Sequence, residues 1–596
     1  MEQKSQQIES NLAEARSKRV WIPFLYLSPF LATFCYILAF GVNIPANDDW
    51  MFVETFRAAH QGTHAFLEKV WIPHLEHRML VPKLVLTGLA YASAFNVKLN
   101  MIVSALLVLI AYIGIVRILR RDERGDELIL HTSAITAGVL MFSLVHQETW
   151  LLGYGLAFVL AAFFSLMAIL ALAQDRWRPH VRIGFSSLFC LLASFSAGSG
   201  LLSWIAILPS VVFMFKKKTR IWAGSAVICL FVITCIIYFV DYHPSVRSHD
   251  WGWCARHPAQ VILFAFMLVG APFCQLAWGA EAHAAPWIGG ALCAGFLFLT
   301  VVAVRQRRAA RVAPWLSIGL FGLGAAALIS VGRAGPGAGS AATSRYMIFS
   351  ICLPVGMILT LGALARSAVQ RWIFVIVAGE LVLLQLSGYS TAIAEGREVR
   401  AERSTARLFL EIEYYIDKRT DNDDRSVFRG LFPPTTTALL LRRPAEILSQ
   451  FGYLKVVQHV SFDDQPAFCG CIDSLVPANS GVLQMNAPGD IYVSGYALVP
   501  KASPAKIVLV SAGDDHLFVT GARVEGHVSR GTNRVSTPLL QCRWEALVPG
   551  YSLPRGEFQL KAWLYDADNA RFLKLADCNG PTRVVVTPAP SVRAVN

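Results

Sequence analysis

Long apolar runs separated by short basic clusters make up the first 390 residues of the chain. A helix that spans a membrane needs about 20 mostly apolar residues, so each run predicts a spanning helix or one arm of a helical hairpin. We therefore predict a polytopic α-helical membrane domain at 1–390, with about 11–12 transmembrane segments. The predicted segments are 21–42, 101–119, 128–145, 153–172, 183–195, 200–215, 221–240, 286–304, 315–331, 347–365 and 372–386.

The basic clusters orient these segments. Lys and Arg accumulate in cytoplasmic loops, and here they occupy alternate joints, beginning just before the first run. The large loop 43–100 is therefore expected outside. Residues 261–278 form a further apolar run, but a full crossing there would place Arg305 and its basic neighbours outside. We interpret 264–273, which a glycine and a proline interrupt, as re-entrant or interfacial.

The chain changes character near residue 391. Residues 391–459 contain an Arg- and Glu-rich stretch that predicts a helix, then a proline-marked loop, and we interpret them as a connector. From 460 to 596, short apolar runs are separated by Gly, Pro, Asn and Asp, which is typical of strands and turns. We predict a C-terminal β-sandwich domain that is extracytoplasmic, because the last span is expected to end on the outer side.

Composition supports a membrane protein. Of the 596 residues, 55% are hydrophobic and 16% are charged, against roughly 45–50% and 25% in average soluble domains. This balance excludes an ordinary soluble enzyme and a disordered chain. The net charge is +13, from 53 basic and 40 acidic residues. Because the excess lies between apolar runs, it indicates membrane orientation, and we expect no nucleic-acid partner.

Four of the 12 cysteines lie in the C-terminal domain, where an oxidising compartment permits up to two disulfides. The disulfide candidates are Cys469, Cys471, Cys542 and Cys578. Cys469 and Cys471 stand two residues apart, so we expect them to pair with the other two and not with each other. The alternative is four unpaired thiols. The Cys-x-Cys spacing is a poor match to a zinc site.

Two adjacent carboxylates follow the first apolar run. Asp48 and Asp49, next to Trp50, open the predicted outer loop. In such a pair, burial and mutual repulsion can raise one pKa, which suits a general base that works near neutral pH. The alternative is structural: Asp48 caps a helix that begins at Trp50, and Asp49 interacts favourably with the helix dipole.

A second polar cluster in the same loop contains His74, Glu76, His77 and Arg78. If this segment is helical, His74, His77 and Arg78 share one face through their i, i+3 and i+4 spacing. Two imidazoles and a guanidinium on one patch predict an anion site, because the planar guanidinium matches phosphate. One alternative is a surface salt-bridge group. A divalent metal site has no standard ligand spacing to support it, so we predict no metal or other cofactor.

Arginines also occur on the expected outer side later in the chain. Arg333 precedes a stretch rich in Gly, Ala and Ser, and Arg345 and Tyr346 follow it at the start of the next span. Small residues let backbone approach a ligand closely, and arginines against the positive-inside bias indicate a bound anion. The alternative is snorkelling to lipid phosphate. Glu148 and Trp150, in a short outer loop, are further candidates.

With these residues identified, the layout resembles that of the GT-C superfamily of integral-membrane glycosyltransferases. This group includes protein mannosyltransferases and the bacterial aminoarabinose and arabinofuranosyl transferases. The shared features are a first outer loop with an acidic pair, here Asp48 and Asp49, membrane-parallel helices after it, many spans, and a soluble outer C-terminal domain. The 74–78 and 344–346 motifs look like those of uncharacterised bacterial members. The resemblance covers about residues 20–390.

The resemblance implies an enzyme of the bacterial plasma (inner) membrane that transfers a monosaccharide from a polyprenyl-phosphate donor. The acceptor would be a hydroxyl of a glycan, lipid or protein at the outer face. Asp48 or Asp49 would be the general base of a single, inverting displacement. The substrate-binding residues would be His74, Glu76, His77, Arg78, Glu148, Trp150, Arg333, Arg345 and Tyr346.

Other functions fit parts of the pattern. A transporter or flippase of lipid-linked saccharide would share the apolar groove and the arginines but would need no base, and it is the main alternative. An outer assembly protein that the membrane half merely anchors would need only one helix. A membrane acyltransferase would use His74 or His77 as its base.

Overall fold

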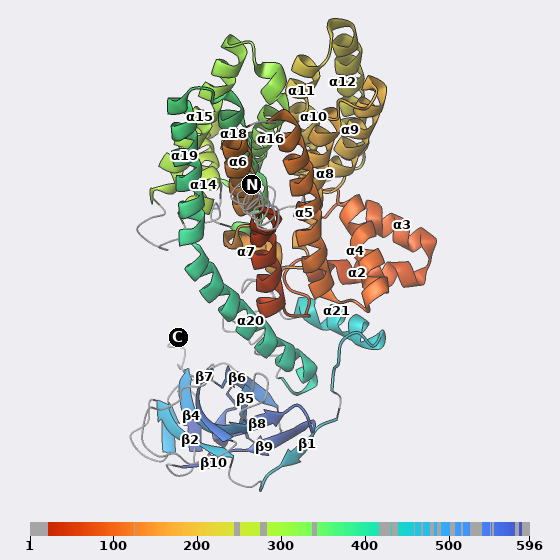
Figure 1. Ribbon diagram of the computed structural model, residues 1–596. Coiled ribbons are helices and arrows are strands. Elements are labelled where there is room, and N and C mark those ends of the chain that lie inside the picture. The colour runs from red at the N-terminus through yellow and green to blue at the C-terminus, as the bar shows by residue number, and fades with distance from the viewer. Residues whose placement is uncertain are drawn as a thin grey trace, which may run out of the picture. The chain divides into compact units, whose positions relative to one another are not determined.

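The structure is a computed structural model of the chain (Figure 1). It describes residues 22–74, 76–123, 126–242, 251–274, 283–335, 343–416, 431, 439–457, 459–465, 469–476, 482–485, 490–500, 507–513, 517–524, 539–548, 550, 553–578 and 583–586. The chain forms two compact units. The helical unit comprises Met1–Asn43 and Thr55–Arg397, and the sandwich unit comprises Ile44–Glu54 and Glu398–Asn596.

In the part of the chain that the structure describes, nine helices are long and apolar enough to cross a membrane. Each overlaps a predicted segment, which supports a multi-pass membrane protein. They are Ile22–Phe40, α5 (Val97–Asp122), α6 to α7 (Glu127–Leu151), α8 (Gly155–Leu172), α12 (Lys217–Phe239), α15 (Ala285–Arg305), α16 (Ala309–Arg333), η6 to α18 (Ser344–Leu364) and α19 to α20 (Ala368–Glu411).

The remaining helices of the membrane region are shorter. The loop 43–100 contains three of them, and the predicted hairpin at 183–215 is α9 followed by a broken helix. These helices are α2 (Asp49–Gln61), α3 (Thr63–Trp71), α4 (Leu80–Ser93), α9 (Pro179–Ser194), η2 (Gly198–Leu202), α10 (Ser203–Ala206) and α11 (Leu208–Met214).

The segment predicted to be re-entrant forms α14 (Pro258–Gly270) and η3 (Ala271–Phe273), of 13 and 3 residues. At a rise of about 1.5 Å per residue this helix is shorter than the hydrocarbon core of a bilayer. It packs closely on α15, because a Cβ at Gly270 would lie 1.9 Å from the carbonyl oxygen of Ala285. Glycine at this contact lets the two backbones approach, as small residues do in other membrane helix pairs.

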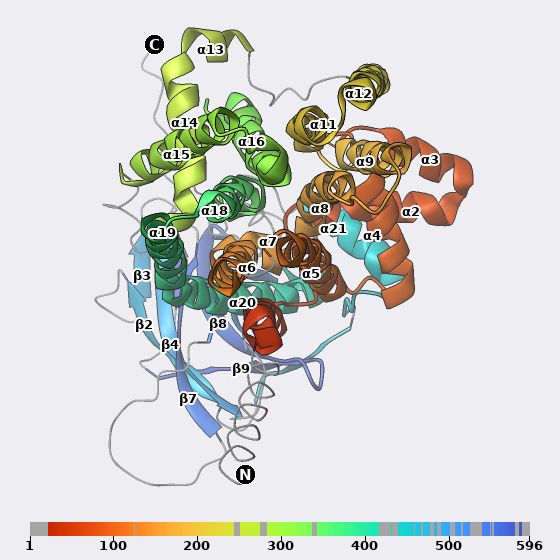
Figure 2. The same ribbon diagram turned by 45° about the horizontal axis from the view of Figure 1, so that its top comes forward.

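The helices α12, α15 and α19 (Ala368–Ser387) lie at the periphery of the helical unit (Figure 2). They expose large apolar side chains. Ile236 is 64% exposed, Phe298 67% and Leu383 68%. Water-soluble proteins rarely expose contiguous apolar surface, whereas lipid solvates it. We therefore assign these faces to contact with lipid.

Ion pairs join the turns at one end of the helical unit. Arg311, near the start of α16, pairs with Glu123 after α5 at 2.6 Å. Arg371, in the first turn of α19, pairs with Asp126, the N-cap of α6, at 2.9 Å. Both arginines belong to the basic clusters that the sequence assigns to the cytoplasmic side, so those cations also hold neighbouring helix ends together.

The sandwich unit contains two β-sheets among its described residues. The larger has the order β1-β9-β8-β11-β3, with β5 also paired to β8 and β6 paired to β5. The smaller has the order β10-β2-β4-β7. The strands are β1 (Ser461–Asp463), β2 (Gly470–Val476), β3 (Val482–Met485), β4 (Ile491–Pro500), β5 (Ile507–Ala512), β6 (Phe518–Arg523), β7 (Leu539–Val548), β8 (Gly556–Asp566), β9 (Arg571–Lys574), β10 (Ala576–Asp577) and β11 (Arg583–Val586).

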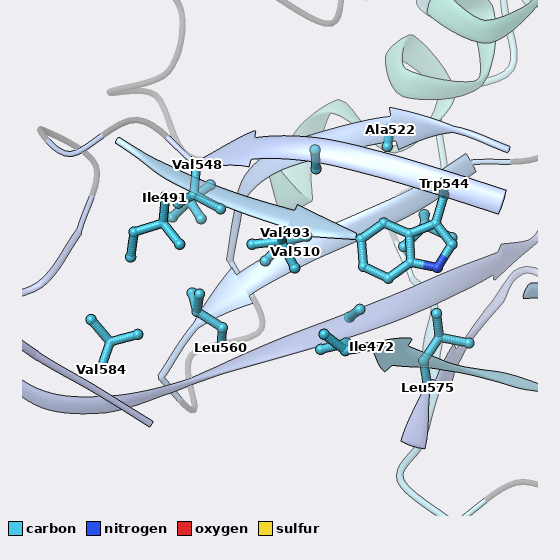
Figure 3. Close-up of a cluster of buried hydrophobic side chains, with 14 of the residues drawn as sticks. Ile472, Ile491, Val493, Val510, Ala522, Trp544, Val548, Leu560, Leu575 and Val584 are labelled. Atoms are coloured by element: carbon cyan, nitrogen blue, oxygen red, sulfur yellow. The ribbon is translucent and has the colours of Figure 1, made fainter. Parts of the chain in front are cut away.

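Apolar residues from both sheets form one shared core (Figure 3). Val493 and Trp544 come from β4 and β7 of the smaller sheet, and Val510 and Leu560 come from β5 and β8 of the larger. All four are at most 1% exposed. Two sheets around one core form a sandwich, as the alternating runs predict.

The sandwich contains a disulfide between Cys471 and Cys578. The short strand β10 pairs with β2 beside Cys471, and this pairing brings Cys578 to its partner. Cys469 and Cys542 do not form the second expected disulfide. The thiol of Cys469 donates to the carbonyl oxygen of Lys574 at 3.5 Å, while Cys542 is buried in β7.

The segment Ile44–Glu54 belongs to the sandwich unit, although it follows the first membrane helix in sequence. The N–H of Asn47 donates to the carbonyl oxygen of Leu431 at 2.7 Å, and Glu54 pairs with Arg443 at 3.2 Å. The predicted division of the chain at residue 390 therefore leaves out this earlier segment, which makes its contacts within the sandwich unit.

Candidate functional site

The predicted polar cluster lies in a tight turn between α3 and α4. The N–H of His74 donates to the carbonyl oxygen of His77 at 2.7 Å, and the reverse bond measures 2.9 Å. The helical spacing expected for His74, His77 and Arg78 is therefore wrong. Pro73 is the cause, because proline cannot continue the helix and keeps the preceding Ile72 extended, at φ −58° and ψ 130°.

Arg78 is fully buried and holds helix ends together. Its Nε donates to the carbonyl oxygen of Tyr238 at 2.7 Å, its Nη1 to that of Trp71 at 3.1 Å, and its Nη2 to that of Val240. These carbonyls end α12 and α3, where the helix dipoles favour a cation. The centroid of the Trp71 ring also lies 4.4 Å from the guanidinium carbon of Arg78. This geometry gives Arg78 a structural role in place of the phosphate contact expected from the sequence.

Lys83 is a second buried cation, and sequence reasoning missed it. Its Nζ donates to the carbonyl oxygens of Lys69, Val70 and Ile72, at 2.9, 3.4 and 2.6 Å. The ammonium therefore satisfies the C-terminal carbonyls of α3. The available signal was a lone lysine within the otherwise apolar α4, which predicts a cation that must find partners.

A cavity of about 370 Å³ lies within the helical unit beside this turn. Most of its wall is apolar and comes from α8, α12, α16 and the start of the η6 to α18 helix. It brings together four residues that the sequence singled out in distant segments. These are Glu76, His77, Arg333 and Tyr346; the wall also includes Phe158, Tyr238, Phe239, Tyr242, Leu328, Ile329 and Phe349.

Glu76 and Arg333 form an ion pair in the cavity wall. Arg333 Nη2 lies 3.0 Å from Glu76 Oε2, and the two side chains are 29% and 21% exposed. Arg333 ends α16, where the helix dipole also favours a cation. The hydroxyl of Tyr242 donates to the carbonyl oxygen of Glu76 at 3.0 Å and so fixes the turn. Sequence reasoning missed Tyr242.

His77 lies against η2 with one side of its ring in the cavity wall. A Cβ at Gly198 would lie 3.0 Å from its Nδ1, and that nitrogen is enclosed without a hydrogen-bond partner among the described residues. Burial lowers the pKa of His77 to about 4; Glu76 raises it and Arg333 lowers it. The imidazole is therefore neutral near pH 7 and offers a ligand a hydrogen bond, not a charge.

Like His77, His74 is neutral near pH 7, but it lies in a different environment. It is 6% exposed, and its ring centroid is 5.5 Å from that of Tyr154. Burial, followed by the charge of Lys83, lowers the pKa of His74 to about 4. Two neutral imidazoles do not form the cationic patch that the sequence predicts. Arg333 supplies the cationic group of the cavity wall.

Glu148 forms two hydrogen bonds with the segment that contains Arg345. Its Oε2 accepts from the backbone N–H of Arg345 at 3.2 Å, and its own N–H donates to Ser344 Oγ at 3.1 Å. Tyr346 lies in the cavity wall, and its ring centroid is 5.4 Å from the Arg345 guanidinium carbon. Trp150 is fully buried and donates its indole N–H to a backbone carbonyl at 2.8 Å, so its ring packs inside the protein and offers no stacking face.

The acidic pair belongs to the sandwich unit, whereas the cavity is formed by residues of the helical unit. α2 begins at Asp49, whose Oδ2 accepts from the N–H of Ala46 at 3.1 Å. Asp49 is 5% exposed, while Asp48 is half-buried. Asp49 therefore stabilises the turn that precedes its own helix, which is a different bond from the helix cap that the structural interpretation assigned to Asp48.

No group of three or more His, Cys, Asp or Glu side chains in the described ranges is placed to hold a metal ion. Comparison of the chain with protein-family models, curated proteins and solved structures finds no match.

Proposed function

We propose that the protein is a membrane glycosyltransferase that moves a monosaccharide from a polyprenyl-phosphate carrier to an acceptor hydroxyl. The observation that carries this proposal is the cavity of about 370 Å³, with its apolar wall and the guanidinium of Arg333. An apolar wall suits an isoprenoid chain, and a guanidinium beside it suits the phosphate that joins the chain to a sugar.

Arg333 is proposed to bind the carrier phosphate and to stabilise the negative charge that develops on it. A cation held in place before the reaction lowers the barrier because it needs no reorganisation as the charge forms. His77 and Tyr346 line the same wall and would orient the polar head through hydrogen bonds. Arg78 and Lys83 act as positioning residues, since both hold the turn that carries Glu76 and His77.

Asp48 or Asp49 is proposed as the general base, as the resemblance to the GT-C superfamily implies. In an inverting transfer a general base takes the proton of the acceptor hydroxyl as its oxygen attacks the anomeric carbon, and the bond from that carbon to the phosphate oxygen breaks with its electrons leaving on phosphate. Attack from the opposite face inverts the configuration. Phosphate leaves without protonation, so the scheme demands no separate general acid.

The arginine clusters support a reaction at the outer face of a bacterial plasma membrane. α16 begins near Arg311, in the basic end of the helical unit, and ends at Arg333 in the cavity wall. If the basic end is cytoplasmic, as the positive-inside bias favours, the polar part of the cavity faces the outside. The sandwich unit would then be extracytoplasmic, a location that its disulfide suits.

A transporter or flippase of lipid-linked saccharide is the second candidate, because the same cavity would serve it. The two functions differ in their need for a base. We would supply the purified protein with labelled polyprenyl-phosphate sugars and an envelope extract as acceptor source. Wild type should form labelled product, and Asp48→Asn should reduce kcat by at least 100-fold without changing donor binding.

The matched control is Asp464→Asn, an exposed carboxylate of the same unit, which should transfer at the wild-type rate. Wild-type transfer rates in both Asp48→Asn and Asp49→Asn would remove the base from the scheme. Movement of the labelled lipid across vesicles, without any transfer by wild type, would favour the flippase.

A further inference from the structure

Three arginines converge where two helix turns meet at the basic end of the helical unit. Arg308 lies in the turn between α15 and α16, and Arg366 lies in the turn between α18 (Cys352–Leu364) and α19. Nη1 of Arg308 donates to the carbonyl oxygen of Leu364, the last residue of α18, at 3.4 Å, so the two turns are in contact. The third arginine, Arg311, is in the first turn of α16.

These arginines are close enough to repel one another. Burial, followed by the charges of Arg366 and Arg311, lowers the pKa of Arg308. An arginine stays protonated at neutral pH, so the repulsion is not relieved by the loss of a proton. Arg311 pairs with Glu123 at 2.6 Å. In the part of the chain that the structure describes, no carboxylate pairs with Arg308 or Arg366. The cluster therefore attracts an anion.

The start of α16 adds to this positive potential. Its N-cap is Arg308, whose side chain has no acceptor and leaves the first turn without a side-chain cap. The first N–H groups of a helix lack carbonyl partners and form the positive end of the helix dipole. The positive-inside bias accounts for basic residues at this end of the protein, but it does not require three of them to converge on one point.

Apolar side chains are exposed directly beside the arginines. Val304 is at the end of α15, and Val369 and Trp372 are in the first turns of α19. They continue the lipid-facing surfaces of α15 and α19, and α18 contacts both helices (Figure 2). Tryptophan is also typical of the border between the hydrocarbon core and water. A ligand at the arginines thus has apolar surface next to it, which suits an amphiphile better than a free inorganic anion.

We propose that this end of the helical unit is a binding site for an anionic phospholipid, whose phosphate contacts Arg308, Arg311 and Arg366 and whose acyl chains lie along α15 and α19. The lipid comes from the bilayer leaflet at the basic end. Basic pockets between membrane helices bind headgroups of this kind. Arg333, in the cavity wall, is at the other end of α16, so the inference does not depend on the proposed function.

The test compares two phospholipids with identical acyl chains. Dioleoyl phosphatidylglycerol has a net negative charge, and dioleoyl phosphatidylcholine has none. Binding of each lipid to the full chain in detergent would be measured by native mass spectrometry at pH 7. Wild type should bind phosphatidylglycerol about 25-fold more tightly, because the two arginines without a carboxylate partner contribute about fivefold each.

Arg308→Gln and Arg366→Gln should each weaken the binding of phosphatidylglycerol about fivefold and leave that of phosphatidylcholine unchanged. Arg366→Lys keeps the charge and should retain most of the affinity. The matched control is Arg176→Gln, which alters an exposed arginine after α8 and should behave as wild type. Thermal unfolding without added lipid will show whether each variant is folded, and if one glutamine variant is not, the other decides.

Equal binding of the two lipids by wild type would overturn the inference. So would an equal loss of affinity in Arg176→Gln, because the preference would then belong to the basic surface as a whole. Phosphatidylglycerol with a photoreactive acyl chain should label α15 and α19, and labels absent from both helices would reject the site. Sugar transfer is measured separately. Lipid selectivity without transfer would reject only the proposed function, and transfer without lipid selectivity would reject only this inference.

Discussion

The guanidinium of Arg78 donates a 2.7 Å hydrogen bond to the carbonyl oxygen of Tyr238, one residue before the end of α12. This bond joins the turn between α3 and α4 to a helix 160 residues later in the sequence. Helix ends leave carbonyls unpaired, and a buried arginine satisfies several of them at once. Arg78, which the sequence predicts to bind phosphate, therefore holds in place the turn that contains Glu76 and His77.

Substitution of Arg78 should therefore affect stability before catalysis. Arg78→Gln should lower the free energy of unfolding by about 3 kcal/mol, because buried carbonyls lose charge-assisted hydrogen bonds. Arg78→Lys should recover only part of the loss, since an ammonium cannot reproduce the planar fork. The unfolding midpoint in detergent and the KM for the donor, at temperatures below the unfolding transition, would both be measured. An unchanged unfolding midpoint with a greatly raised KM would instead show that Arg78 contacts the ligand.

His74 should make stability depend on pH between 6.5 and about 4. Its pKa falls from 6.5 when unfolded to about 4 in the folded protein, because burial disfavours the charged ring. The unfolded chain therefore binds the proton more readily in this window, and stability present above pH 6.5 is lost as the pH falls. The loss is about 3 kcal/mol.

Unfolding midpoints measured across this range should fall less steeply in His74→Gln than in wild type. His180→Gln, which alters an exposed histidine, should keep the wild-type slope. Parallel curves for wild type and His74→Gln would show that the ring titrates normally in the fold.

The disulfide should stabilise the sandwich unit. Cys471 and Cys578 are 107 residues apart in sequence, so their link closes a long loop in the unfolded chain. Replacing both by serine should cost about 4 kcal/mol. Alkylation of the unfolded, unreduced protein followed by mass spectrometry should label Cys469 and Cys542 and spare the linked pair. Protection of all four would mean that the second expected disulfide forms after all.

The proposed orientation predicts opposite labelling of two introduced cysteines. Arg366→Cys lies in the exposed turn after α18, and Asp464→Cys lies in an exposed position after β1. In a Cys469→Ser background, an impermeant maleimide should label Asp464→Cys in intact spheroplasts and label Arg366→Cys only after permeabilisation. The reverse pattern would invert the topology and place the chemistry inside.

The lengths of the apolar runs were sufficient to predict the long apolar helices but not where those helices end. The run 101–119 predicts the centre of α5, which extends from Val97 to Asp122. Its first turn contains Lys98 and its last turn Arg120 and Arg121, polar residues that a hydrophobicity pattern excludes but that helix ends accommodate.

The cavity could not be predicted, because its wall combines segments near residues 76, 198, 240, 330 and 346. Individual residues such as Glu76 and Arg333 were identified, but their pairing depends on tertiary packing that no local pattern encodes. Pro73 was a local signal, and it should have argued against a helix through His74. Similarly, spacing could not decide between the cysteine pairings, which depend on how β10 meets β2.

The most direct test of the account is to find where an isoprenoid phosphate binds. The protein in nanodiscs would be photolabelled with a diazirine-bearing polyprenyl phosphate, and the labelled peptides mapped by mass spectrometry. We predict labels at the cavity wall, on Leu328, Ile329 and Phe349, that excess unlabelled carrier removes. Labels confined to the lipid-facing surfaces of α12, α15 and α19, unaffected by competitor, would contradict the claim that this cavity holds the carrier.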